Sequence, residues 1–210
     1  MSDAQPQIYL ITPPLPDPER FPDQLAGILD AQAIACVRLQ MAGDDAGAIA
    51  RMADRLREVT HARDVALVIA EHALLAGQLG LDGVHLDHRS RLAGGSGLRK
   101  LRADLGTDAI IGVHCGQSRH AGLSAGEAGA DYIAFGPVGG TELEDGARAP
   151  DDLFAWWSEV VELPVVAEGA LRADDVARLA PVTDFFGIGA EIWGDDDPLS
   201  ALHALTAALR

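Results

Sequence analysis

Basic residues are scarce in this sequence, and lysine is almost absent. Lys100 is the single lysine, and 16 Lys and Arg residues stand against 32 Asp and Glu residues, so the formal net charge is −16 over 210 residues. Nucleic acids and anionic membrane surfaces are polyanions that bind proteins through basic side chains. The composition therefore argues against a nucleic-acid partner and against a membrane-surface partner.

Cysteine and long hydrophobic runs are also lacking. Cys36 and Cys115 are too few and too far apart to indicate a disulfide framework, which predicts two reduced thiols. No apolar run reaches the roughly 18 residues of a membrane-spanning helix. The first residues, MSDAQPQ, lack the basic and apolar regions of a signal peptide. These absences together predict a cytoplasmic protein.

An alternation of short apolar runs and helical patterns is present instead. The apolar runs are 8–12, 35–40, 65–70, 82–86, 109–114, 131–135, 164–168 and 184–189, and helical patterns between them include 47–60, 150–161 and 197–209. Strands that are apolar almost throughout are typical of a parallel sheet buried on both faces. Eight strand–helix units predict one domain over 1–210, a single (β/α)₈ TIM barrel in the α/β class. An open doubly wound sheet is the alternative, and the count of eight units disfavours it.

The strand ends locate the candidate site. Ligands of such a barrel bind at the C-terminal ends of the strands, where the following loops converge. The residues that fall there are Gln40, Met41, Glu71, Asp87, His88, His114, Cys115, 141–145, 168–171 and 187–193.

Several of these stretches resemble one known family. The runs DGVHLD, GEAGADYIAFGPV followed by Thr141, and PVVAEGAL have the order and spacing of the thiamine phosphate synthase and thiazole tautomerase (TenI) family. CGQSRH before the fifth helix and Trp193 at the end of the eighth unit are similar to one subgroup of synthases. The resemblance covers nearly the whole chain and implies a barrel enzyme, a transferase of thiamin biosynthesis. Its synthases couple an aminopyrimidine diphosphate to a thiazole phosphate, with magnesium on the diphosphate.

The resemblance also assigns roles to residues of this chain. Glu71 matches one magnesium-binding position, and Asp87, which lies three residues before the other, is the second candidate magnesium ligand. His114 stands where the family has a diphosphate-binding serine. The remaining substrate- and phosphate-binding positions are Arg38, Thr141, Gly169, Ala170, Gly187 and Gly189.

Many of the family's charged positions are altered. Where the family has Gln-Leu-Arg-x-Lys after the second strand, residues 38–42 read Arg-Leu-Gln-Met-Ala, so both basic positions are lost. Arg38 lies two positions before the motif's arginine, on the same strand face, and we expect it to substitute in part. Ser90 replaces a magnesium-binding aspartate, and Glu144 replaces a lysine of the loop after the sixth strand. Since two unit charges about 4 Å apart interact by roughly 4 kcal/mol at an effective dielectric near 20, these changes predict little or no coupling activity.

Carboxylates accumulate at the predicted strand ends. If their side chains face inward, the barrel mouth favours a cation over a diphosphate, either thiamin, whose thiazolium ring is positive, or a divalent metal with histidine ligands. If they face outward, they form a solvated acidic surface. The residues concerned are Glu71, Asp87, Glu144, Glu168 and Glu191, with His88 and His114 as the histidines.

Three interpretations stay open. The chain is a divergent synthase that uses magnesium, a non-catalytic protein that binds a small molecule such as a cation or a thiamin-related compound, or a thiazole-tautomerase-like isomerase. The tautomerase histidine corresponds to Gly116 or Gln117, which disfavours the third. His85 is interpreted as a packed structural histidine, and Trp156 and Trp157 as packing residues. The oligomeric state is not predicted.

Overall fold

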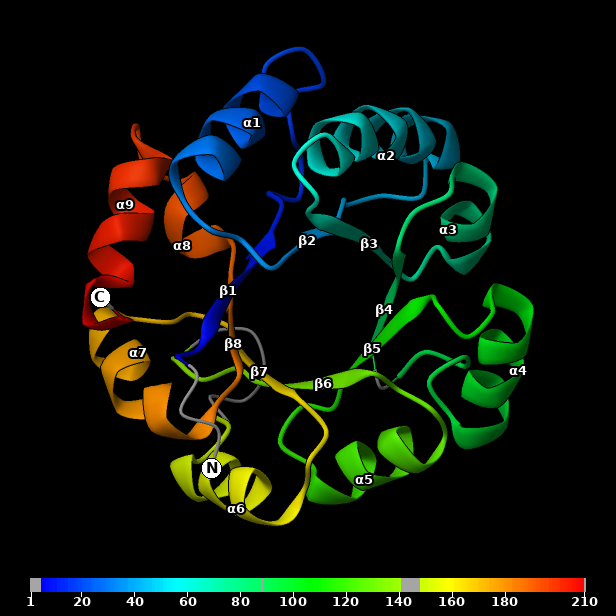
Figure 1. The fold of residues 1–210 in the computed structure, drawn as a ribbon, viewed down its shortest axis with the longest axis vertical. Helices are drawn as coiled ribbons and strands as arrows, with labels where there is room; N and C mark the ends of the chain where they lie inside the picture. The colour runs from blue at the N-terminus through cyan, green and yellow to red at the C-terminus, as the bar shows by residue number, and fades with distance from the viewer. Residues whose placement is uncertain (1–4, 88, 141–147, 210) are drawn as a thin grey trace.

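The predicted barrel is what the computed structural model shows. Eight parallel strands form a closed barrel in sequence order, β1 to β8, and the helices surround it as an outer ring (Figure 1). The structure describes residues 5–87, 89–140 and 148–209. Thr141 and Glu144 of the predicted site, and His88, lie outside these residues.

The strand boundaries agree with the sequence pattern, since each observed strand begins within one residue of the predicted start. The elements are β1 (Gln7–Ile11), α1 (Phe21–Ala31), β2 (Cys36–Leu39), α2 (Ala46–His61), β3 (Ala66–Ala70), α3 (Ala73–Leu79), β4 (Gly83–Asp87), α4 (Gly95–Leu105), β5 (Ile110–His114), α5 (Arg119–Glu127), β6 (Tyr132–Phe135), α6 (Asp151–Val160), β7 (Val165–Glu168), α7 (Ala173–Leu179), η1 (Ala180–Val182), β8 (Phe185–Ile188), α8 (Ala190–Trp193), α9 (Pro198–Leu205) and η2 (Ala207–Leu209).

Two apolar clusters hold the fold together. The larger lies between the strands and the surrounding helices. The smaller contains side chains from several strands, among them Tyr9 of β1 and Tyr132 of β6. Gly112 of β5 makes room for Tyr132, because a Cβ atom at position 112 would lie 2.0 Å from Cζ of that ring. This packing leaves two hydroxyl groups near the barrel axis, where they need partners.

Outside the barrel, Trp157 fills the gap between α6 and the sheet. Its ring centroid lies 5.1 Å from that of Phe135, and its Nε1–H donates to the carbonyl of Leu163 at 2.8 Å. The side chain is almost fully buried, so the prediction that Trp157 is a packing residue is confirmed.

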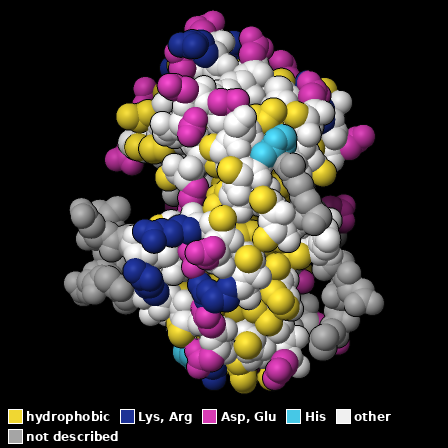
Figure 2. All heavy atoms as spheres, turned by 90° about the vertical axis from the view of Figure 1, so that its left-hand side faces the viewer, with side chains coloured by type: hydrophobic (Ala, Val, Ile, Leu, Met, Phe, Trp, Pro, Cys, Tyr) yellow, Lys and Arg dark blue, Asp and Glu magenta, His cyan; other side chains and the backbone are white. Residues whose placement is uncertain are grey.

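The surface reflects the acidic composition. On the face shown in Figure 2, Asp and Glu side chains are widely spread and Arg side chains lie among them. Arg178, for example, is paired with Asp151 and Asp175. Among the described residues, no helix has the length and apolar character needed to cross a membrane.

Candidate functional site

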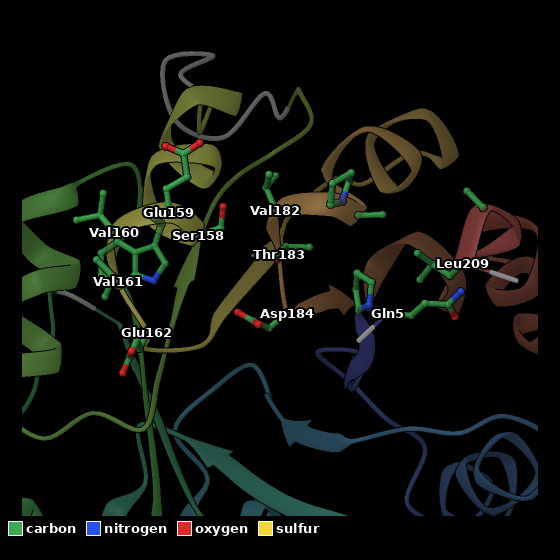
Figure 3. Close-up of a pocket in the computed structure, with 15 residues that line it drawn as sticks. Gln5, Ser158, Glu159, Val160, Val161, Glu162, Val182, Thr183, Asp184 and Leu209 are labelled. Carbon is green, nitrogen blue, oxygen red and sulfur yellow. The ribbon is translucent and has the colours of Figure 1, made fainter. Parts of the chain in front are cut away.

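A cavity of about 580 Å³ opens at the C-terminal ends of the strands, where barrel ligands bind. The described residues that line it are Arg38, Gln40, Met41, Gly43, Asp44, Ala70, Glu71, His72, His85, Asp87, His114 and Glu168. A larger cavity, of about 820 Å³, lies at the other end of the barrel beside the starts of β1, β7 and β8 (Figure 3). We take the mouth cavity as the candidate site, because titratable side chains from five strands or strand ends converge there.

An ion pair between Arg38 and Glu168 lies at the bottom of the mouth cavity. Nη1 of Arg38 is 3.0 Å from Oε2 of Glu168, and the two residues are 4% and 8% exposed. Burial acts to lower the pKa of Arg38, but the Glu168 carboxylate together with Tyr9 and Tyr132 outweighs it, and the pKa lies above its ordinary value. Gly187 of β8 leaves the space for Glu168, since a Cβ at position 187 would lie 2.8 Å from that of Glu168.

A chain of hydrogen bonds extends from Arg38 into the barrel. Nη1 of Arg38 lies 2.7 Å from Nε2 of His85, and Nδ1 of His85 lies 2.9 Å from the hydroxyl of Tyr132. That hydroxyl is 2.6 Å from the hydroxyl of Tyr9. A guanidinium can only donate, so Nε2 of His85 accepts and the ring proton sits on Nδ1, from which it is donated to Tyr132.

His85 is neutral within this series of hydrogen bonds. Burial lowers the pKa of His85 well below its ordinary value, and the nearby charges of Arg38 and His114 lower it further. Burial also raises the pKa of Tyr132 above its usual range. His85 is thus a buried histidine with hydrogen bonds on both ring nitrogens, as the sequence interpretation had it.

A second group of polar side chains lies at the ends of β3, β4 and β5. The backbone N–H of Asp87 donates to Oε1 of Glu71 at 2.6 Å, and Oδ1 of Asp87 accepts from the N–H of Arg89 at 2.8 Å. Nδ1 of His114 is 3.8 Å from Oδ2 of Asp87, and its Nε2 is 3.8 Å from Oε1 of Glu168. His114 therefore lies between the Asp87 and Glu168 carboxylates.

Magnesium can be tested against this group. The carboxylates of Glu71 and Asp87 are the hard oxygen ligands that the ion prefers, and the two residues lie at the ends of neighbouring strands, where the backbone N–H of Asp87 donates to Glu71. Among the described residues, no three His, Cys, Asp or Glu side chains are placed to hold a metal ion. Magnesium is commonly bound by one or two carboxylates together with water and substrate phosphate. The pair therefore fits magnesium as one half of a site that a phosphate ligand completes.

The predicted phosphate-binding residues after β7 and β8 lie outside the lining of the mouth cavity. Gly169, Ala170, Gly187 and Gly189 are not among the described residues that line it. Gly187 accommodates Glu168, and a Cβ at Gly189 would lie 3.0 Å from that of Ile11. Glycine at positions 187 and 189 therefore makes room for the neighbouring side chains of Glu168 and Ile11.

Ala170 adopts a conformation that suits glycine. Its φ is 54°, next to Gly169 at 91°, and a left-handed conformation costs an L-residue roughly 1–2 kcal/mol. We expect Ala170→Gly to stabilise the protein by about 1 kcal/mol, after allowing for the greater freedom of glycine in the unfolded chain. Thermal unfolding should show a rise in Tm of about 2–4 °C. Gly27→Ala, at a helical position with open space around the added Cβ, is the control for glycine–alanine exchange. A lowered Tm for Ala170→Gly would contradict the expectation.

Sequence reasoning missed some of the residues that line the cavity. Asp44 and His72 line the cavity from the loops after β2 and β3. Both residues lie beyond the strand ends that the sequence analysis considered, and their place in these two loops was the signal that could have found them.

Cys36 and Cys115 are both free thiols, as the sequence predicts. Burial raises the pKa of Cys115 to about 12, so this thiol is protonated at neutral pH and is a poor nucleophile.

Comparison with known proteins gives a consistent result. Residues 8–189 match the family described as thiamine monophosphate synthase. A thiamine-phosphate synthase of Rhodospirillum centenum is 38% identical over 197 residues, covering 92% of this chain and 91% of the relative. A thiamine-phosphate synthase of Erythrobacter litoralis is 36% identical, covering 91% of this chain and 90% of the relative.

Solved structures support the fold. A thiamine phosphate pyrophosphorylase from Pyrococcus furiosus superposes with a TM-score of 0.81 at 21% identity, covering 97% of this chain and 95% of that one. A 3-hexulose-6-phosphate synthase superposes with a TM-score of 0.69 at 16% identity, covering 97% and 100%. At these identities the likeness shows a shared barrel and leaves the reaction undetermined.

Proposed function

Because this chain belongs to the thiamine monophosphate synthase family, we propose that its barrel mouth binds a small thiamin-related molecule that carries a positive charge. The proposal has a second part, which is that coupling of a diphosphate substrate is very slow or absent. Both parts concern the same cavity and depend on its charge.

The ion pair between Arg38 and Glu168 carries the proposal. Arg38 is the one Arg or Lys among the described residues that line the cavity, and Glu168 neutralises it at 3.0 Å. The same lining contains four carboxylates, those of Asp44, Glu71, Asp87 and Glu168. A diphosphate entering this cavity would meet an excess of negative charge, whereas the thiazolium ring of thiamin would be attracted.

Synthase activity itself is the second candidate, and two observations favour it. The two relatives described above bear the synthase name and match more than nine tenths of this chain. Glu71 and Asp87 also lie at neighbouring strand ends, where the backbone N–H of Asp87 donates to Glu71, and carboxylates there suit magnesium bound together with a diphosphate. On this alternative, Glu168 must release Arg38 to the diphosphate when the substrate binds.

Calorimetric titration with thiamin, thiamin phosphate and inorganic diphosphate, each with and without magnesium, tests the proposal. We expect thiamin to bind more tightly than thiamin phosphate and inorganic diphosphate to show no detectable binding. An assay with both thiamin precursors and magnesium should give turnover far below the roughly 1–10³ per second of typical enzymes.

The variant Glu168→Gln supplies a matched comparison, because it keeps the shape of the side chain while removing the charge that neutralises Arg38. It should weaken thiamin binding and improve diphosphate binding. Tight, magnesium-dependent binding of diphosphate to the unmodified protein, together with ordinary turnover, would reject the proposal and establish the synthase alternative.

A further inference from the structure

The helix α4 and the loop before it are basic in an otherwise acidic chain. Five of the 16 Lys and Arg residues lie within 89–102, and no Asp or Glu lies between Asp87 and Asp104. Arg102 of this segment pairs with Asp131. The remaining basic side chains of the segment are placed on the outside of the barrel.

The outer face of α4 carries this charge. The two buried residues of the helix are leucines, whereas Arg99 and Lys100 are exposed. Arg91 is also exposed, and its backbone lies against the first turn of α4, because a Cβ at Gly97 would be 2.7 Å from the carbonyl oxygen of Arg91. Figure 1 shows α4 in the outer ring between α3 and α5. We refer to Arg91, Arg99 and Lys100 as the α4 basic patch.

The three cations of the patch have no ionic partner in the described part of the chain. Several exposed arginines elsewhere do have one, as Arg119 has in Asp152 and Arg178 has in Asp151. Leu92, the neighbour of Arg91 in the loop, is 36% exposed. The surface therefore presents three positive charges and an apolar side chain to solvent.

From this placement we propose that the α4 basic patch is a docking surface for an acidic segment of a partner protein. The chain has a net charge of −16, so an acidic partner is repelled by most of the surface and attracted at this patch. The 11 residues of α4 span roughly 16 Å. This length matches a partner helix of about the same size, with carboxylates along one side and an apolar residue to cover Leu92.

Other occupants fit this surface less well. Nucleic acids and anionic membranes extend well beyond three cations, and they would meet the acidic remainder of the protein. A two-fold dimer through this face would bring α4 of one protomer against α4 of its partner, which places like charges together. A compact acidic segment avoids both conflicts.

The docking surface adjoins the barrel mouth. The loop that contains Arg91 follows β4, and the last residue of β4, Asp87, lines the mouth cavity. The carboxylates of that cavity repel an acidic segment and so confine it to the outer face. The proposal concerns this outer face and does not depend on which ligand the mouth cavity binds.

Titration of ¹⁵N-labelled protein with a synthetic acidic peptide tests the proposal. The peptide is rich in glutamate, has a leucine near its middle, and matches the roughly 16 Å length of α4 when helical. We expect amide resonances to shift in residues 89–105 and to stay unchanged on the other faces. Binding should weaken as salt is raised from about 0.01 M to about 0.15 M, because the Debye length falls from about 30 Å to about 8 Å.

Charge reversal at Arg99 has a matched control on another helix. Arg99→Glu should weaken peptide binding about tenfold, because an attraction is replaced by a repulsion. Nη2 of Arg99 lies 3.4 Å from the Cβ position of Gly95, four residues earlier. Arg51 of α2 is likewise exposed, and its Nη1 lies 3.3 Å from the Cβ position of Gly47. At α2 the carboxylate of Asp45 caps the helix, so Arg51→Glu should leave peptide binding within about twofold of the wild type.

Two further anions test the choice of partner. Vesicles that contain phosphatidylserine and a short single-stranded DNA should both bind more weakly than the peptide. Tighter binding of either one would overturn the proposal and assign the patch to a membrane or to a nucleic acid. The proposal also fails if the peptide shifts no resonances of α4 at low salt, or if Arg99→Glu binds the peptide as well as Arg51→Glu does.

Discussion

Replacement of Arg38 by methionine is expected to destabilise the protein by about 3–5 kcal/mol. The variant leaves the Glu168 carboxylate buried without its guanidinium partner, and the removal of one member of a buried ion pair costs far more than the pair itself contributes. His85 also loses the donor to its Nε2. Urea unfolding at neutral pH measures the effect as a lowered midpoint at unchanged slope.

The double variant Arg38→Met/Glu168→Leu is expected to recover most of that loss. It replaces both charges with apolar groups, so no uncompensated carboxylate remains, and such replacements are often close to neutral. Recovery should be incomplete, because His85 still lacks its donor. A double variant that loses less stability than the sum of the two single variants would give a coupling free energy that shows the two side chains interact.

An exposed ion pair provides the control. Arg55 and Glu19 lie 3.0 Å apart with side chains 43% and 81% exposed, and such pairs contribute about 0–1 kcal/mol. Arg55→Met should therefore have a small effect. If Arg38→Met proved as mild as Arg55→Met, the ion pair at the base of the cavity would not exist in the folded protein as described.

Lowering the pH should destabilise the protein through His85. The folded protein keeps this imidazole neutral, with its pKa well below the ordinary value, while the unfolded chain takes up the proton near pH 6.5. The unfolded state therefore binds more protons below that pH, and stability falls as pH falls. The contribution is fully present above about pH 6.5 and is lost by about 1.4 kcal/mol per pH unit, down to the folded-state pKa.

Comparison with His85→Gln isolates this contribution from that of the other histidines. Glutamine is neutral and can still hydrogen-bond, so the variant lacks the proton uptake of an unfolded histidine at this position. The difference in unfolding free energy between wild type and variant should be constant above about pH 7.5 and change by about 1.4 kcal/mol per unit below about pH 6.5. A difference that stays constant down to pH 5 would show that His85 is protonated as easily in the folded state as in the unfolded state.

The order of strands and the location of the site follow from the sequence alone. Apolar runs of strand length, alternating with helical patterns, indicate a parallel sheet whose strands are buried on both faces, and the count of eight units favours a closed barrel. In that fold all strand ends meet at one mouth. Strand-end position therefore predicted that Glu71, Asp87, His114 and Glu168 would line one cavity, as they do.

The partners of these side chains were decided by the tertiary structure. Alternation along β2 predicts that Arg38 faces inward but not which side chain across the barrel meets it, because that depends on strand register and on the space left by Gly187. The position of Glu191 after β8 likewise does not reveal that its carboxylate turns to the amides of Gly189 and Leu171. The alternation of residues along a strand determines which face of the sheet each side chain occupies. Which charged side chains pair across the barrel depends instead on the distances between residues that are far apart in the sequence, and only the tertiary structure gives those distances.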